Sequence, residues 1–215
     1  FATGSVPLIP KFIKGYDLNN VEYIRKSHCY MDELRTKALT VNDIVIIGGG
    51  FIGVEVAEQL AKHPDKKVHL VEMREHCLSA AFSEKLTTIA DQSIRDAGVD
   101  LHTSSKVIEI QGQNGIAKAV LLDDGTLIPA DLVIMSIGYV PNTELAKTAG
   151  LALTANGAIK RDNYMRTPML DVFAVGDCSE SIGFITGRSD NIMLASTATA
   201  EARILGYNLF GICLT

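Results

Sequence analysis

The sequence lacks long apolar runs, an excess of positive charge and closely spaced cysteines. Its longest apolar runs, such as residues 132–137, have the length of a strand and are too short for a transmembrane helix. The formal net charge of −5 argues against nucleic acid or an anionic membrane surface as a partner. With 47% hydrophobic and 21% charged residues among 215, the chain has the composition of a globular protein with one large or two small domains.

The cysteines and histidines form no familiar motif. The four cysteines show no C-x-x-C, no C-x₄-C and no zinc spacing: Cys29, Cys77, Cys178 and Cys213. We therefore expect reduced thiols in a cytoplasmic protein. The five histidines are scattered without metal spacing, and we expect ordinary surface or strand residues that bind no metal: His28, His63, His69, His76 and His102.

The most informative segment is a glycine-rich turn within residues 43–60, DIVIIGGGFIGVEVAEQL. An apolar strand leads into Gly48, Gly50 and Gly53, which form G-x-G-x-x-G, and a helix follows directly. Gly48 permits the sharp turn, Gly50 lets the backbone approach a pyrophosphate, and Gly53 lets the helix pack closely against the strand. The pattern predicts a dinucleotide-binding turn.

The residues after the turn complete this pattern. Around Phe51 and Ile52 the free N–H groups of the first helical turn would face the phosphates, together with the positive end of the helix dipole. Glu72 lies 19 residues beyond Gly53, at the end of a second apolar strand, where it would accept hydrogen bonds from the adenosine ribose. This favours NAD(H) over NADP(H), although Arg74 could instead pair with a 2′-phosphate.

The order of expected elements indicates an α/β fold. The first part should contain, in chain order, helix 31–39, strand 44–47, helix 51–62, strand 67–73, helix 83–97, strand 99–101, antiparallel strands 106–110, 116–122 and 126–128, and strand 131–137. We expect a three-layer, Rossmann-like NAD-binding domain with a parallel sheet and an antiparallel β-meander. A separate unit should follow, with strand 169–177, loop 179–191 and helix 195–209.

Four segments give the chain a family resemblance. They are ATG at Ala2–Gly4, GGGFIGVE at Gly48–Glu55, IGYVPNTEL at Ile137–Leu145 and VFAVGDCSE at Val172–Glu180. In this order and spacing they resemble the flavin-dependent pyridine nucleotide–disulfide oxidoreductases, and most closely the branch of NADH oxidases, NADH peroxidases and coenzyme A-disulfide reductases.

The resemblance implies roles for particular residues. Asp177 matches the aspartate that contacts the ribityl chain of FAD. Glu55 matches a glutamate near nicotinamide and flavin, or it pairs with the helix dipole. Phe51 either covers the flavin face or packs between helix and sheet. Gly138 and Pro141 either shape the backbone near the cofactors or form a plain strand-exit turn.

The resemblance also implies an internal piece of a longer protein. Residues 1–39 should be the end of an FAD-domain segment with a connector, 40–158 the NAD(H)-binding domain, and 159–215 a second, incomplete FAD-domain segment. The redox-active cysteine is expected upstream, so that no catalytic residue lies in this chain. A dimerisation domain is expected downstream, and the complete protein should be a homodimer.

The function implied by the resemblance is transfer of a hydride from NADH to FAD and on to a disulfide, peroxide, oxygen or carrier acceptor. The chain alone should bind NAD(H), retain FAD poorly and be inactive. The alternative is a stand-alone, non-catalytic nucleotide-binding or redox-sensing module. A conventional NAD-dependent dehydrogenase is disfavoured, because the sequence contains no Tyr-x-x-x-Lys.

Overall fold

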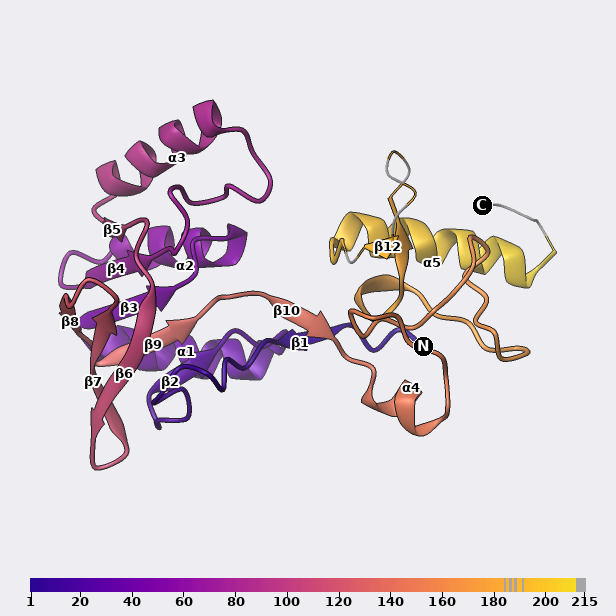
Figure 1. Ribbon diagram of the computed structural model, residues 1–215, viewed down its shortest axis with the longest axis horizontal. Helices are drawn as coiled ribbons and strands as arrows, with labels where there is room; N and C mark the ends of the chain where they lie inside the picture. The colour runs from indigo at the N-terminus through magenta and orange to yellow at the C-terminus, as the bar shows by residue number, and fades with distance from the viewer. Residues whose placement is uncertain (184, 186, 188, 191, 212–215) are drawn as a thin grey trace. The chain divides into compact units, whose positions relative to one another are not determined.

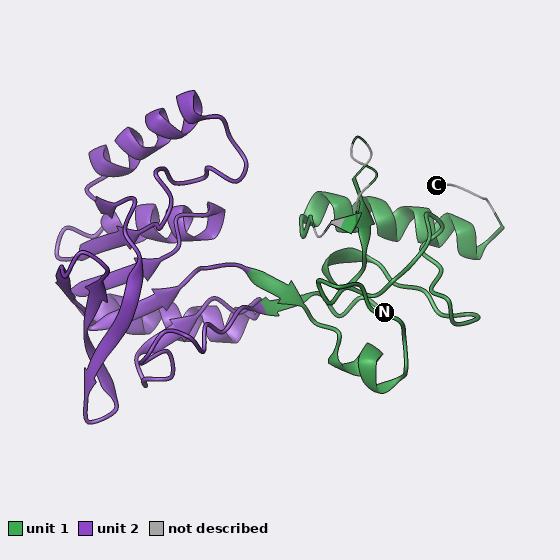
Figure 2. Ribbon diagram, viewed as in Figure 1, with its two compact units in different colours: residues 1–6, 139–215 green, residues 7–138 purple. Residues whose placement is uncertain are grey.

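The computed structural model describes residues 1–183, 185, 187, 189–190 and 192–211. The chain divides into two compact units, shown in Figure 2. Unit 1 consists of Phe1–Val6 and Tyr139–Thr215, and unit 2 of Pro7–Gly138. No helix among the described residues is long and apolar enough to cross a membrane.

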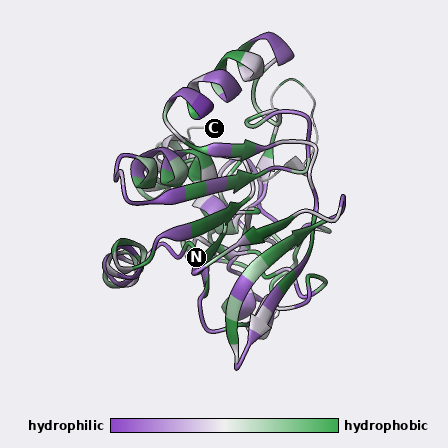
Figure 3. Cartoon of the chain, turned by 90° about the vertical axis from the view of Figure 1, so that its left-hand side faces the viewer, coloured by the Kyte–Doolittle hydropathy of each residue, from purple (hydrophilic) through white to green (hydrophobic). Residues whose placement is uncertain are grey.

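Unit 2 is built on a five-stranded parallel sheet (Figure 1). Its strands, in spatial order, are β2 (Val21–Tyr23), β9 (Leu132–Met135), β3 (Asp43–Ile47), β4 (Lys67–Val71) and β5 (Asp100–His102). Each neighbouring pair runs parallel. Four of the five residues of the central strand β3 are apolar, because the strand is covered on both faces. In Figure 3 the strands carry green, hydrophobic stretches.

Alternate side chains of the sheet face two different layers. On one face, residues such as Ile44, Ile46 and Leu70 form a core with three helices. These helices are α1 (His28–Thr40), α2 (Phe51–Ala61) and α3 (Glu84–Asp96). Because side chains alternate along a strand, Val45 and Ile47 point to the opposite face.

The opposite face of the sheet packs against an antiparallel β-meander. Its strands are β6 (Val107–Gln113), β7 (Ile116–Leu122) and β8 (Leu127–Pro129). They form the second core with Val45, Ile47 and Val71 of the parallel sheet. The expected three-layer arrangement of helices, parallel sheet and meander is thereby confirmed, and so is the α/β fold class.

Unit 1 has little regular structure. Its elements are β1 (Ser5–Pro7, of which Pro7 belongs to unit 2), β10 (Tyr139–Pro141), α4 (Glu144–Thr148), the 3₁₀ turn η1 (Gly176–Cys178), β11 (Ser181–Ile182), β12 (Ser189–Asp190) and α5 (Ala195–Leu209). A small core of Ala146, Leu151, Ile159, Ala174 and Cys178 holds it together. Helix α5 has the predicted bounds.

The expected strand at 169–177 is wrong. A turn occupies its start, where Asp171 has φ +60°, and η1 occupies its end. The apolar residues between them join no sheet but pair with the start of the chain. The Phe1 amino group donates to the Phe173 carbonyl at 2.6 Å, and Val175 N–H donates to the Phe1 carbonyl at 3.0 Å. These residues are apolar because they fill the core of unit 1.

The compact units also divide the chain elsewhere than at the predicted boundaries of 39/40 and 158/159. Strand β2, which was not expected, forms the edge of the parallel sheet through its pairing with β9. Residues as early as Ile13 are therefore buried in the core of unit 2. After Gly138 the chain packs instead around Ala146 and Ile159. Short strands that depend on a distant partner leave little trace in local periodicity.

We expect Ile46→Ala to destabilise unit 2 by about 2–5 kcal/mol, because it removes a fully buried side chain and leaves a cavity between sheet and helices. Urea unfolding followed by circular dichroism measures the loss. Ile89→Ala is the matched control, since Ile89 is 58% exposed on α3 and its loss should cost less than about 1 kcal/mol. Equal losses in both variants would contradict the assigned core.

Candidate functional site

The glycine-rich turn is a close contact between the end of β3 and the start of α2. Gly48 has φ +109°, and a Cβ there would lie 2.4 Å from the Ser136 carbonyl oxygen. A Cβ at Gly53 would lie 1.9 Å from the Gly48 carbonyl oxygen. Both positions exclude any side chain, so that the two glycines fix how closely the helix approaches the strand.

Gly49 and Gly50 lie between these two glycines, and their surroundings differ. A Cβ at Gly49 would lie 2.5 Å from the Cys77 sulfur, which makes Gly49 a third required glycine that the motif does not specify. A Cβ at Gly50 would meet nothing within 4 Å, and its φ of −76° is open to any residue. Neither packing nor backbone conformation therefore requires glycine at Gly50, and its bare backbone faces open space.

Glu72 follows β4 and is tied to the turn. Its Oε2 accepts a hydrogen bond from the Gly49 N–H at 2.7 Å, and its Oε1 accepts one from the Arg74 N–H at 2.8 Å. The Glu72 N–H donates to the His102 carbonyl at 2.8 Å. A carboxylate has about four lone-pair positions, so that two remain for a ligand. Arg74 contributes its backbone, and its side chain is exposed.

The other predicted residues of unit 2 lie around the turn with less specific contacts. Phe51 is half exposed at the start of α2 and meets Phe82 edge to face, with ring centroids 5.9 Å apart. Ile52 packs against the core between the parallel sheet and the helices, and Glu55 is exposed. Gly138 has φ +113° and accepts a hydrogen bond from the Leu8 N–H, as a strand-exit turn would.

Asp177 lies in unit 1, within η1. Its Oδ2 accepts a hydrogen bond from the Ser5 hydroxyl at 2.8 Å. The turn begins at Gly176, whose φ of +72° favours glycine. Pro141 ends β10 in the same unit. The hydrogen bond from Ser5 to Asp177 therefore joins the two sequence segments that make up unit 1, and it gives Asp177 a defined position.

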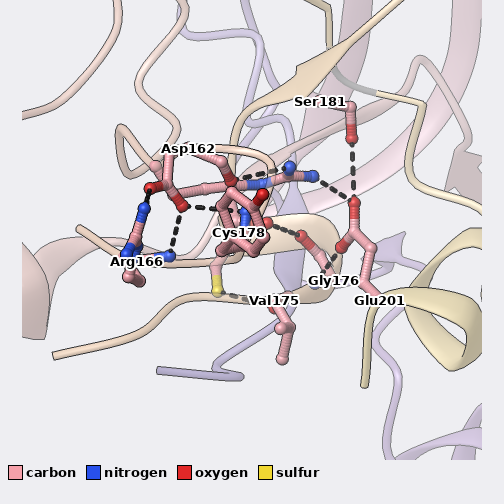
Figure 4. A network of polar contacts seen from close by, with 10 residues as sticks. Asp162, Arg166, Val175, Gly176, Cys178, Ser181 and Glu201 are labelled. Atoms are coloured by element: carbon pink, nitrogen blue, oxygen red, sulfur yellow. Dashed lines mark hydrogen bonds and ion pairs between the residues drawn. The ribbon is translucent and has the colours of Figure 1, made fainter. Parts of the chain in front are cut away.

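Glu201 holds the Asp177 turn in place, as Figure 4 shows. This side chain of α5 is buried, and its Oε2 accepts a hydrogen bond from the Gly176 N–H at 2.7 Å. Its Oε1 pairs with the buried Arg161 guanidinium at 2.5 Å. Sequence reasoning missed Glu201, although a lone acid among small residues on α5 was an available signal. Glu201 and Arg161 are positioning residues for the turn.

A shallow depression lies between η1 and the start of α5. It is lined by Asp177, Ser179 and Ser181 on one side and by Leu194, Thr197 and Ala198 on the other. It encloses only about 10 Å³, far less than the roughly 300–1,000 Å³ of most ligand pockets. The described residues around Asp177 therefore form only a small, open depression.

The cysteines described by the structure form no redox pair. Cys29, Cys77 and Cys178 are all free thiols, and the last two are buried. Burial raises the pKa of Cys77 to about 12, with smaller effects from Asp91 and Glu72. A thiol protonated at neutral pH is a poor nucleophile. Cys213 lies outside the described residues.

Comparison with known proteins decides the family. The family model for pyridine nucleotide-disulphide oxidoreductases matches residues 1–202. The chain belongs to this family. The resemblance found in the four sequence segments is thereby confirmed.

The relatives of this pyridine nucleotide-disulphide oxidoreductase chain include enzymes with different names. It is 33% identical to an NAD(P)H sulfur oxidoreductase (CoA-dependent) of Pyrococcus abyssi, over 98% of this chain and 46% of the relative. It is 32% identical to an NADH oxidase of Enterococcus faecalis, over 96% of this chain and 46% of that enzyme. The chain therefore spans about half the length of the curated relatives it matches.

Solved structures of the family show the same fold. A NAD-dependent persulfide reductase from A. fulgidus matches with a TM-score of 0.90 and 32% identity, over 98% of this chain and 38% of that one. A water-forming NADH oxidase from Lactobacillus brevis, bound to NADH, matches with a TM-score of 0.87 and 30% identity, over 97% of this chain and 45% of that one.

We expect Gly53→Ala to destabilise unit 2 by more than about 2 kcal/mol, because the new methyl group collides with backbone at Gly48. Gly50→Ala is the matched control within the same turn and should leave stability within about 0.5 kcal/mol, since its methyl group enters open space. Thermal unfolding of both variants measures the difference. If Gly53→Ala unfolds at the same temperature as the unchanged chain, the turn geometry is contradicted.

We expect Glu201→Ala to destabilise unit 1 by about 3–5 kcal/mol, because it leaves the buried Arg161 guanidinium unpaired and removes the acceptor for Gly176. The control is Glu58→Ala, which breaks an exposed pair with Lys62 and should cost less than about 1 kcal/mol. Urea unfolding compares them. Similar small losses in both would show that the buried network contributes little.

Proposed function

We propose that this chain is the NAD(H)-binding portion of a flavin-dependent oxidoreductase. The complete enzyme would pass a hydride from NADH to FAD and on to a disulfide, peroxide, oxygen or carrier acceptor. The observation that carries the proposal is the open backbone at Gly50, which lies at the start of α2 and next to Gly49, whose N–H donates to the Glu72 carboxylate. Similarity to enzymes of this kind, including an NADH oxidase bound to NADH, supports it.

The start of α2 would bind the pyrophosphate of NAD(H). The first N–H groups of a helix have no acceptor within it, and the helix dipole adds positive potential there. Phe51 and Ile52 begin this helix directly after Gly50. The missing side chain at Gly50 lets an anion reach these N–H groups, whereas Gly48 and Gly53 only shape the turn.

Glu72 would select NAD(H) over NADP(H). Its carboxylate is already oriented by the N–H groups of Gly49 and Arg74, and its remaining lone pairs would accept hydrogen bonds from the ribose hydroxyls. A 2′-phosphate would instead meet this negative charge at close range. The exposed Arg74 side chain could offset part of the repulsion, so that we propose a preference and not complete exclusion.

Asp177 would hold FAD in unit 1. Its carboxylate borders the depression beside α5, and a carboxylate there can accept hydrogen bonds from ribityl hydroxyls. Glu201 and Ser5 fix the turn that presents it. When bound, the flavin supplies the hydride-accepting and electron-transferring chemistry, while this chain contributes binding and orientation.

The remaining roles are proposed on the resemblance alone. Phe51 and Glu55 would lie near the nicotinamide and flavin, and Gly138 would shape the backbone near the cofactors. Residues 40–158 would form the NAD(H)-binding domain, between FAD-domain segments at 1–39 and 159–215. The redox-active cysteine would belong to a segment that precedes this chain.

For the complete protein we propose a homodimer in the cytoplasm that binds no nucleic acid. The lack of closely spaced cysteine motifs in the sequence favours a reducing compartment. The net charge of −5 disfavours binding to nucleic acid. Light scattering of the full-length protein tests the dimer, and a monomer at all concentrations would reject it.

We expect Gly50→Ala to weaken NADH binding by about tenfold, or 1.4 kcal/mol, without loss of stability, since its methyl group occupies the space of the pyrophosphate. NADH fluorescence measures the dissociation constant. Gly206→Ala is the matched control, because its methyl group also enters open space, but on α5. Glu72→Gln should lower the ratio of NADH affinity to NADPH affinity, and the same titration measures both affinities.

Two outcomes would reject the proposal. One is a folded chain that binds neither nucleotide at millimolar concentration. The other is a full-length protein without a flavin that NADH can reduce, as followed by flavin absorbance in stopped flow. If the full-length protein binds NADH but holds no flavin, the alternative of a non-catalytic nucleotide-binding or redox-sensing module takes its place.

A further inference from the structure

Two histidines and an aspartate meet at the edge of the parallel sheet in unit 2. His69 lies on β4, and Asp100 and His102 lie on the edge strand β5. The two strands are parallel, with His69 paired to Asp100 and Val71 to His102. Because side chains alternate along a strand, these three residues point to the same face of the sheet. Sequence spacing does not indicate this cluster, since its members come from separate strands.

The three side chains converge on a common point. His69 Nδ1 lies 3.2 Å from Asp100 Oδ2 and 3.3 Å from His102 Nε2, and the latter two atoms are 3.6 Å apart. Zinc binds nitrogen and oxygen ligands at about 2.0–2.2 Å with tetrahedral geometry, which places neighbouring ligands about 3.3–3.6 Å apart. The observed triangle thus has nearly the dimensions of one face of a zinc tetrahedron.

Hydrogen bonding alone accounts poorly for this triangle. His69 Nδ1 is close to two possible acceptors, but a neutral imidazole nitrogen carries at most one hydrogen. It can bond well to Asp100 or to His102, and not to both. A cation at the centre would satisfy all three atoms together.

The electrostatic environment favours a cation there. The carboxylates of Asp43 and Asp124 lie within electrostatic range of His69 and His102 respectively. Their negative charge would be partly neutralised by a divalent ion.

We propose that His69, Asp100 and His102 form a binding site for a divalent transition metal, with zinc as the best fit. Nδ1 of His69, Nε2 of His102 and Oδ2 of Asp100 would be the three protein ligands. The Asp100 side chain is 64% exposed, so that a fourth position is open to water or to an external ligand. The site shares no side chain with the nucleotide-binding turn, although the His102 carbonyl accepts a hydrogen bond from the Glu72 N–H. The proposal does not depend on the function proposed for that turn.

The metal would join β5 to β4. Strand β5 has three residues, and among the described residues it pairs only with β4. A metal that bridges His69 to Asp100 and His102 would add a second connection between the strands. Zinc should therefore raise the unfolding temperature of the chain as well as bind to it.

The test is a titration of zinc chloride into the chain by isothermal calorimetry, with Cys29→Ser and Cys213→Ser in the background so that neither of these cysteines can bind zinc. We expect one saturable site, which His69→Gln and His102→Gln each weaken by about tenfold or more. His63→Gln is the matched control, because His63 is an exposed histidine outside the cluster, and it should bind zinc like the background chain.

Thermal unfolding with and without zinc gives a second measurement. Zinc should raise the unfolding temperature of the background chain and of His63→Gln, and should have little effect on the two cluster variants. If circular dichroism shows that one cluster variant does not fold, the same zinc measurements on the other variant and on Asp100→Asn decide. The proposal is overturned if the background chain shows no saturable zinc binding, or if the folded cluster variants bind zinc as tightly as His63→Gln.

Discussion

The close approach of α2 to the end of β3 is the constraint on which unit 2 depends. The Gly53 backbone lies so near the Gly48 carbonyl that no side chain fits between them, and Gly48 in turn lies against Ser136. This contact directs the first turn of the helix toward the carboxyl end of the parallel sheet. In open α/β sheets that end is where ligands bind, because loops and helix N-termini meet there.

The residue that follows β4 stabilises the same turn through its charged group. Glu72 accepts a hydrogen bond from Gly49, and Gly49 has no room for a side chain because Cys77 lies against it. Charge-assisted hydrogen bonds of this kind are stronger than neutral ones. One carboxylate thus orders the turn while two of its lone pairs remain for a ligand, which joins the stability of the turn to the recognition of the nucleotide.

Unit 1 depends on a different kind of interaction. Its apolar core is small, and the Gly176–Cys178 turn is held by the buried pair of Arg161 and Glu201. A buried ion pair adds little net stability, but it fixes geometry, because either partner alone would be costly to bury. The position of Asp177 is therefore set by side chains from α5 and from the start of the chain, at residues distant from it in sequence.

The sequence by itself determined the features that local chemistry controls. The spacing of Gly48, Gly50 and Gly53 specifies a tight turn whatever surrounds it, and the apolar periodicity places α2, α3 and the central strands within a few residues. Four short motifs were enough to indicate the family.

Only the tertiary structure decided the features that need a distant partner. Residues 172–175 are as apolar as a strand, yet they pair with Phe1 and join no sheet. Strand β2 exists because β9 lies beside it. Glu201 and the His69–Asp100–His102 cluster acquire their roles from contacts between separate elements. Local sequence sets what each segment can form, whereas burial and strand register decide which residues meet, because both depend on the whole folded chain.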